Sequence, residues 1–148
     1  MNDHASTEDL TIMVLTSAEP TVIGNATNFS HTIRPFEVTD NANYEIAMVS
    51  IDYPSNGSTS TYVSCDIVGV SRVGSQLTNI LFRIPQQPVA ANSHYTQNQS
   101  IILWRPLATK AFSVVNVTLT DSSGAYLPVP GGAHTTLTVA IRRVGTVD

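Results

Sequence analysis

The sequence is short of charged side chains. Only 12% of its 148 residues are Asp, Glu, Lys or Arg, about half the usual share for a soluble globular domain. Ser, Thr, Asn and Gln fill the deficit. Because the cores of protein interfaces are depleted in charge, a neutral polar surface suits a protein that is covered by neighbours. A β-rich domain also uses much Thr and Ser, which explains the same composition without an interface.

Basic residues are scarcer than acidic ones. The sequence contains seven Lys and Arg residues and eleven Asp and Glu residues, so the formal net charge is −4. The only basic pair is Arg142-Arg143, and no longer basic run occurs. A nucleic-acid footprint built on phosphate neutralisation is therefore not expected.

Cysteine and long apolar runs are also nearly absent. Cys65 is the single cysteine, so an internal disulfide is excluded, and its apolar surroundings predict a small core residue. The N-terminus lacks the basic and apolar regions of a signal peptide, and no stretch is long enough to span a membrane. We expect a soluble protein made inside the cell, with residues 1–9 as a flexible polar arm and residues 10–148 as one domain.

What the chain does have is alternation of apolar and polar residues. In residues 112–120 and 135–143 the apolar side chains fall on every second position, which is typical of half-buried β-strands. We expect five of them to be buried between two sheets: Val117, Leu119, Leu137, Val139 and Ile141.

Turn residues divide the chain into eight expected strands, and no segment shows convincing helical periodicity. The expected strands are residues 10–15, 29–36, 44–53, 62–70, 77–84, 100–105, 112–120 and 135–143. The apolar phase changes inside residues 44–53, which predicts a β-bulge or a strand that moves between sheets. Long connections at residues 86–99 and 120–134 favour a Greek-key sandwich over a meander. Eight antiparallel strands in one domain allow a jelly roll, another β-sandwich or a small barrel, and the loops favour an all-β, eight-stranded antiparallel β-sandwich.

Residues with catalytic chemistry are dispersed. The four histidines show no metal-ligand spacing, and Asp52 and Asp66 stand alone in the sequence. We therefore predict no enzyme, no catalytic, cofactor-binding or metal-binding residue, and no small-molecule substrate. A β-barrel enzyme with a metal assembled from dispersed His residues remains an alternative.

Four residues are candidates for a contact surface with another protein: Trp104, Arg105, Arg142 and Arg143. Trp104 fits either a core anchor or an interface hot spot, and the core role is preferred. Arg142 and Arg143 close an expected strand, where a solvated strand end is the simpler interpretation.

Several segments together resemble one family of structural proteins. Residues 44–54 form a strand ending in Tyr-Pro, and residues 81–85 end in Arg-Ile-Pro. Residues 117–132 contain an Asp-Ser-Ser-Gly turn and a Pro/Gly stretch, and residues 137–143 form a strand that finishes in Arg-Arg. In this order and spacing the chain resembles the single jelly-roll minor capsid, or penton, proteins of Polinton-type elements and related viruses.

The resemblance implies jelly-roll topology for this sandwich and a structural capsid protein in the virion. Such a protein forms homopentamers at the fivefold vertices of an icosahedral shell and contacts a major capsid protein. The competing expectation is a non-enzymatic β-sandwich binding module, either lectin-like or a decoration or cement protein of the same fold.

Overall fold

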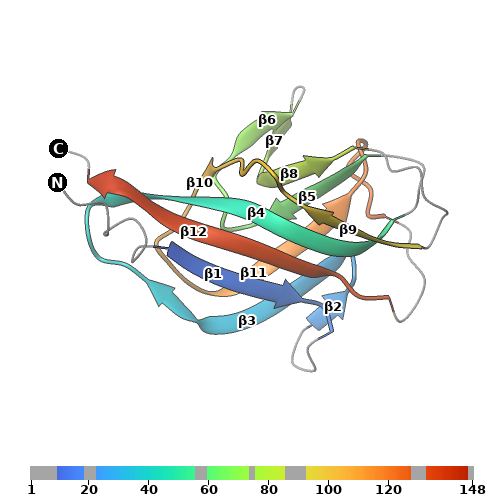
Figure 1. Ribbon diagram of the computed structural model, residues 1–148, viewed down its shortest axis with the longest axis horizontal. Helices are drawn as coiled ribbons and strands as arrows, with labels where there is room; N and C mark the ends of the chain where they lie inside the picture. Colours follow the sequence, from blue (N-terminus) through green and yellow to red (C-terminus); the bar gives the residue numbers. More distant parts are fainter. Residues whose placement is uncertain are drawn as a thin grey trace.

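The protein is an all-β molecule whose antiparallel sheets form a sandwich-like arrangement (Figure 1). The computed structural model describes residues 10–18, 23–55, 60–73, 76–85, 93–127 and 133–146. Those residues contain twelve strands and no helix. The strands are β1 (Leu10–Thr16), β2 (Ile23–Asn25), β3 (Asn28–Glu37), β4 (Ala42–Ser55), β5 (Thr61–Cys65), β6 (Ser71–Val73), β7 (Gln76–Thr78), β8 (Ile80–Ile84), β9 (Ser93–Asn98), β10 (Arg105–Pro106), β11 (Ala111–Thr120) and β12 (Thr136–Thr146).

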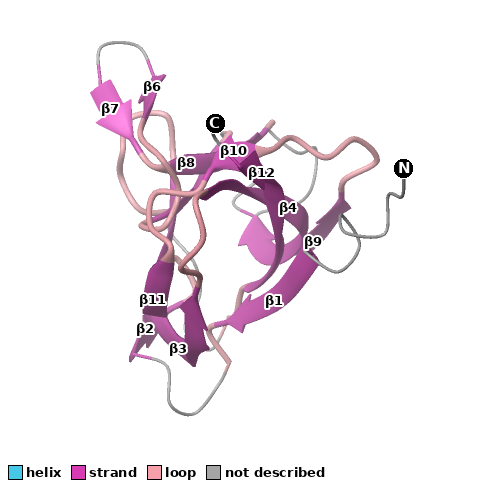
Figure 2. Ribbon diagram, turned by 90° about the vertical axis from the view of Figure 1, so that its left-hand side faces the viewer, coloured by secondary structure: helices cyan, strands magenta, loops and turns pink. Residues whose placement is uncertain are grey.

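Two five-stranded sheets form the body of the molecule, and Figure 2 shows them facing each other. Sheet A has the order β1-β12-β4, and β9 and β10 both pair with β4 at different points along it. Sheet B has the order β2-β3-β11-β5-β8. Strands β6 and β7 form a separate hairpin. All pairings among these strands are antiparallel.

The core lies between the two sheets, as the alternation in the sequence predicts. The five side chains expected there are each at most 1% exposed: Val117, Leu119, Leu137, Val139 and Ile141. Cys65 is also buried, and burial together with the negative charge of Asp66 raises the pKa of its thiol to about 12. The interpretation of Cys65 as a core residue is confirmed.

The expected irregularity in β4 is a β-bulge at Val49. Thr138 of β12 lies opposite Ser50, whereas the next residue, Val139, lies opposite Met48. Val49 therefore has no partner on β12, and the extra residue shifts the alternation by one position. As a result Met48 on one side of the bulge and Ile51 on the other both face the core.

Three strand expectations are wrong. The strand expected at residues 62–70 ends at Cys65, because a turn follows. The strand expected at residues 77–84 is interrupted at Asn79, whose side-chain amide donates a hydrogen bond to the Val68 carbonyl (2.7 Å). The strand expected at residues 100–105 is reduced to β10. Strand β9 lies instead in the segment expected to be a long connection, because its backbone pairs with residues 50–55 of β4.

The expected arm at residues 1–9 lies outside the described residues. The strand that was expected to close at Arg143 continues to Thr146. No helix capable of crossing a membrane occurs in the described part of the chain.

Candidate functional site

Trp104 and Arg142 form the centre of the candidate contact surface. The guanidinium carbon of Arg142 lies 4.1 Å from the centre of the Trp104 ring, so the cation is stacked on the indole. The expected core role of Trp104 is wrong, because its side chain is only half-buried and stands outside the core cluster. The indole packs on a charged group of the sheet surface instead.

Glu45 holds Arg142 in this position. Arg142 of β12 pairs with Glu45 of β4 in the strand register, so their side chains are cross-strand neighbours. The Nε and a terminal nitrogen of Arg142 donate to the same Glu45 oxygen, at 3.0 and 2.7 Å. We call Glu45, Trp104 and Arg142 the Trp104 cluster. It fixes the otherwise irregular segment before β10 to the surface of sheet A.

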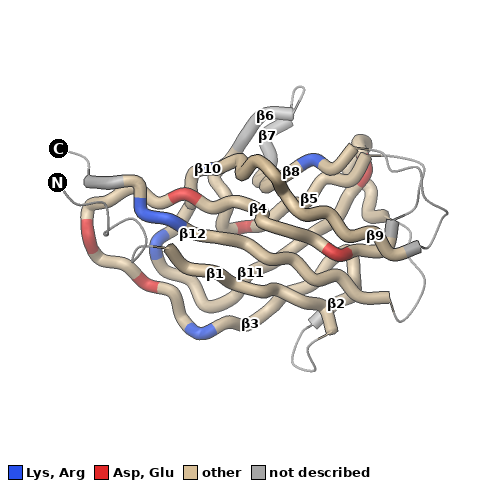
Figure 3. Tube along the Cα trace, viewed as in Figure 1, with Lys and Arg blue, Asp and Glu red and all other residues tan. Residues whose placement is uncertain are grey.

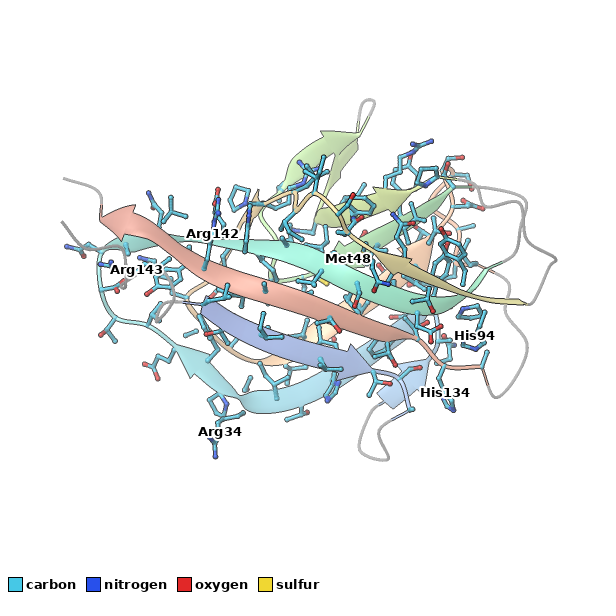
Figure 4. The ribbon with its side chains drawn as sticks, viewed as in Figure 1. Arg34, Met48, His94, His134, Arg142 and Arg143 are labelled. Atoms are coloured by element: carbon cyan, nitrogen blue, oxygen red, sulfur yellow. The ribbon has the colours of Figure 1, made fainter. Side chains whose placement is uncertain are left out.

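Arg143 belongs to a second polar group at the same end of sheet A (Figure 4). Its Nε lies 3.2 Å from an oxygen of Asp40, which also accepts a hydrogen bond from the Tyr44 hydroxyl at 3.0 Å. The other Asp40 oxygen accepts from the Ala42 N–H. Desolvation raises the pKa of Asp40, but the hydrogen bonds from Ala42, Tyr44 and Arg143 outweigh it, so the pKa lies below its usual value.

A groove of about 310 Å³ lies at the same end of sheet A. Its lining combines apolar surface with the edges of both groups: Asn43, Tyr44, Glu45, Pro106, Leu107, Lys110 and Val144. Arg105, which precedes Pro106 in β10, is half-buried, and its backbone pairs with Ile46. Within the described residues Arg105 has no ion-pair partner. The four residues predicted for a contact surface therefore lie at one end of sheet A, and Arg142 and Trp104 touch.

The sequence interpretation missed a set of exposed apolar side chains. Leu10, Ile12 and Val14 are about half exposed on β1, and Ile101 and Leu103 are exposed between β9 and β10. A signal for the first set was present: five of the six residues from Leu10 to Leu15 are apolar, so both faces of this strand are apolar. Strands covered on only one side normally alternate.

The other reactive side chains pair with polar neighbours. Asp52, which stands alone in the sequence, lies 2.9 Å from Nδ1 of His94, and both side chains are about half exposed. Asp66 accepts hydrogen bonds from the backbone and side chain of Asn116 at 3.0 and 2.6 Å. Among the described residues, no group of three His, Cys, Asp or Glu side chains could hold a metal ion.

Comparison with protein-family models finds no match, and comparison with curated proteins finds none either.

Proposed function

We propose that this protein is a structural capsid protein with a jelly-roll fold, which forms homopentamers at the fivefold vertices of an icosahedral shell. In this role it resides in the virion, contacts a major capsid protein and catalyses no reaction. The proposal joins the sequence resemblance described above to the strand order of the two sheets.

The strand order is the observation that carries the proposal. Strands β1, β3, β4, β5, β8, β9, β11 and β12 can be numbered one to eight along the chain. Sheet A then has the order 1-8-3-6, and sheet B has the order 2-7-4-5. This is the order expected when one long antiparallel hairpin is rolled into a double-sheet jelly roll. The short strands β2 and β10 extend the sheets, and the β6–β7 hairpin lies in the connection between the fourth and fifth strands.

The surface chemistry also favours a protein surrounded by neighbours. Figure 3 shows few charged positions along otherwise neutral strands. Several large apolar side chains are exposed as well, including Ile101, Ile12 and Val70. Apolar and neutral polar surface is what the centre of a subunit contact requires.

Native mass spectrometry tests the proposal directly. We expect an assembly of five copies of the 15.9-kDa chain. A protein that stays monomeric or dimeric at high concentration would contradict the vertex role.

A groove on sheet B with carboxylate and amide residues in its lining favours a second candidate, the non-enzymatic binding module. The groove has a volume of about 300 Å³, and Asp66, Asn79 and Asn116 are among the residues that line it. Carboxylate and amide groups can exchange hydrogen bonds with sugar hydroxyls. Saturable binding of a glycan by a monomeric protein, lost in Asp66→Ala, would support this candidate over the capsid role.

A further inference from the structure

Strand β1 has apolar side chains on both faces, although only one face is covered. Leu15 is fully buried and Met13 packs against the core, whereas the alternate residues Leu10, Ile12 and Val14 are 45%, 54% and 54% exposed. We call these three exposed residues the β1 stripe. A contiguous apolar patch on a protein surface commonly marks a contact with another protein.

The β1 stripe lies at an edge of sheet A. Among the described strands β1 pairs with β12 alone, so its other edge is free. Edge strands that remain unpaired are usually protected by Lys, Pro or a bulge, and β1 has none of these. A groove of about 270 Å³ lies between this edge and β3, and Ile12, Ile33 and Phe36 contribute to its lining.

A second apolar patch lies at the opposite edge of the same sheet. Ile101 is 74% exposed and Leu103 is 52% exposed, and both belong to the segment between β9 and β10. We call these two residues the 101–103 ridge. The adjacent residue Trp104 is stacked on Arg142, so the ridge is attached to the sheet at one end.

The strand register places the two patches at the same level along the sheet. Leu10 is opposite Arg142, Arg142 is opposite Glu45, and Glu45 is opposite Pro106. Four residues further along β1, Val14 is opposite Thr138. Thr138 is opposite Ser50, and Ser50 is opposite Asn98. Residues 98 and 106 flank the ridge, so the ridge lies between the same two rows as the stripe. Figure 1 shows β1 and the segment between β9 and β10 at opposite edges of sheet A.

We propose that the β1 stripe of one copy packs against the 101–103 ridge of the next copy. The inference rests on the proposed homo-oligomer and identifies its contact surfaces. Two different patches that meet head to tail generate a closed ring when the rotation between copies divides the circle evenly. A two-fold contact of stripe against stripe would leave the ridge exposed, whereas the head-to-tail contact covers both patches.

The size of the molecule accommodates two such contacts. A standard interface takes about 800 Å² from each partner, so two faces would cover about a fifth of the 8250 Å² surface.

Thiol cross-linking tests which patches meet. The double variant Ile12→Cys/Leu103→Cys is treated with a short bismaleimide, and Cys65 does not compete because it is fully buried with a thiol pKa of about 12. We expect a ladder of covalent species whose largest member has the copy number found by native mass spectrometry. Each single variant alone should give no linked species, and an equal mixture of the two single variants should give linked pairs.

The outcomes separate this inference from the proposed function. Covalent dimers from Ile12→Cys alone would reveal a two-fold stripe contact and overturn the inference. A native pentamer whose double variant forms no ladder, or links only to a different protein, would overturn the inference and leave the pentamer standing. A wild-type chain that remains monomeric at all concentrations would overturn both.

Charge substitutions give an independent measurement. Ile12→Lys and Leu103→Lys should each convert the assembly to monomers, because a charge buried without a partner is unfavourable. Both side chains are half exposed, so we expect folded monomers with an unchanged circular dichroism spectrum. Thr32→Lys, at an exposed position of β3, is the matched control and should leave the copy number unchanged. Persistence of the full assembly in Ile12→Lys would contradict the proposed contact.

Discussion

Leu119 and Ile141 show how strongly single side chains hold the two sheets together. Leu119 comes from sheet B and Ile141 from sheet A, and both are fully buried in the same core cluster. Truncating either residue to Ala should lower the free energy of unfolding by about 2 to 5 kcal/mol, because it removes buried contacts and leaves a cavity. Urea denaturation measures the loss. Val70→Ala, at a side chain that is 62% exposed, is the control and should change stability by less than about 0.5 kcal/mol.

The contact between Arg142 and Trp104 can be followed by fluorescence, because Trp104 is the only tryptophan of the chain. Removing the guanidinium in Arg142→Ala should uncover the indole and shift its emission to longer wavelength. Arg34→Ala, at an exposed residue of β3, should leave the emission unchanged.

A double-mutant cycle then isolates the energy of the stacked pair. We expect a coupling of about 0.5 to 1 kcal/mol between Arg142→Ala and Trp104→Leu, as for other partly exposed cation–π pairs, because leucine removes the aromatic face and keeps an apolar side chain. An emission spectrum of Arg142→Ala that matches wild type would show that the two side chains do not stack in solution.

At the scale of elements, two glycines with positive φ allow the cost of backbone strain to be measured separately from the cost of a steric clash. Gly124, in the turn after β11, has φ +90°, and an added Cβ would meet nothing within 4 Å. Gly24, in β2, has φ +121°, and an added Cβ would lie 2.1 Å from the Asn28 carbonyl oxygen. Gly124→Ala should therefore cost only the conformational strain, about 1 to 2 kcal/mol.

Gly24→Ala should cost clearly more than Gly124→Ala, because β3 must move away from β2 to admit the methyl group. Thermal unfolding of the two variants measured side by side tests this order. Equal losses of thermal stability would mean that β3 moves away from β2 without a cost in free energy.

The sequence predicted the strands whose two faces differ in environment. Strands β11 and β12 each place one face in the core, so their alternation was visible, and the phase change at Val49 indicated the bulge. Strand β9 was not predictable in this way, since its residues are polar apart from Tyr95 and its place depends on backbone pairing with β4. Residues 101–103 were misleading, because an apolar run typical of a buried strand is an exposed connection here.

The candidate site was predictable only as a list of residues. Trp104 and Arg142 lie 38 positions apart, and no local pattern relates them. Their contact follows from the register that sets Arg142 opposite Glu45 and Glu45 opposite Pro106. The β1 stripe was visible in the sequence as a strand without polar alternation, but its location at a free sheet edge required the topology.

At the scale of the whole molecule, Asp40 links the two sheets at one end of the sandwich. It lies in the connection from β3 of sheet B to β4 of sheet A. Its carboxylate accepts a hydrogen bond from Arg143 of β12. Its backbone carbonyl oxygen accepts a hydrogen bond (3.1 Å) from the side chain of Lys110, which lies just before β11. Two strands of each sheet thus meet at this residue.

This arrangement predicts acid sensitivity with a definite sign. The pKa of Asp40 is lowered in the folded protein, so the folded state binds its proton less readily than the unfolded chain does. The carboxylate therefore contributes stability that is fully present above its ordinary pKa near 4. That contribution is lost as the pH falls from there through the lower folded pKa.

Melting temperatures measured between about pH 5 and pH 2 should fall more steeply for wild type than for Asp40→Asn. Glu37→Gln removes an exposed carboxylate at the same end of β3 that makes no hydrogen bond in the described part of the chain, and it should leave the wild-type slope. If Asp40→Asn and Glu37→Gln gave the same slope, the link between the sheets at Asp40 would not contribute to stability.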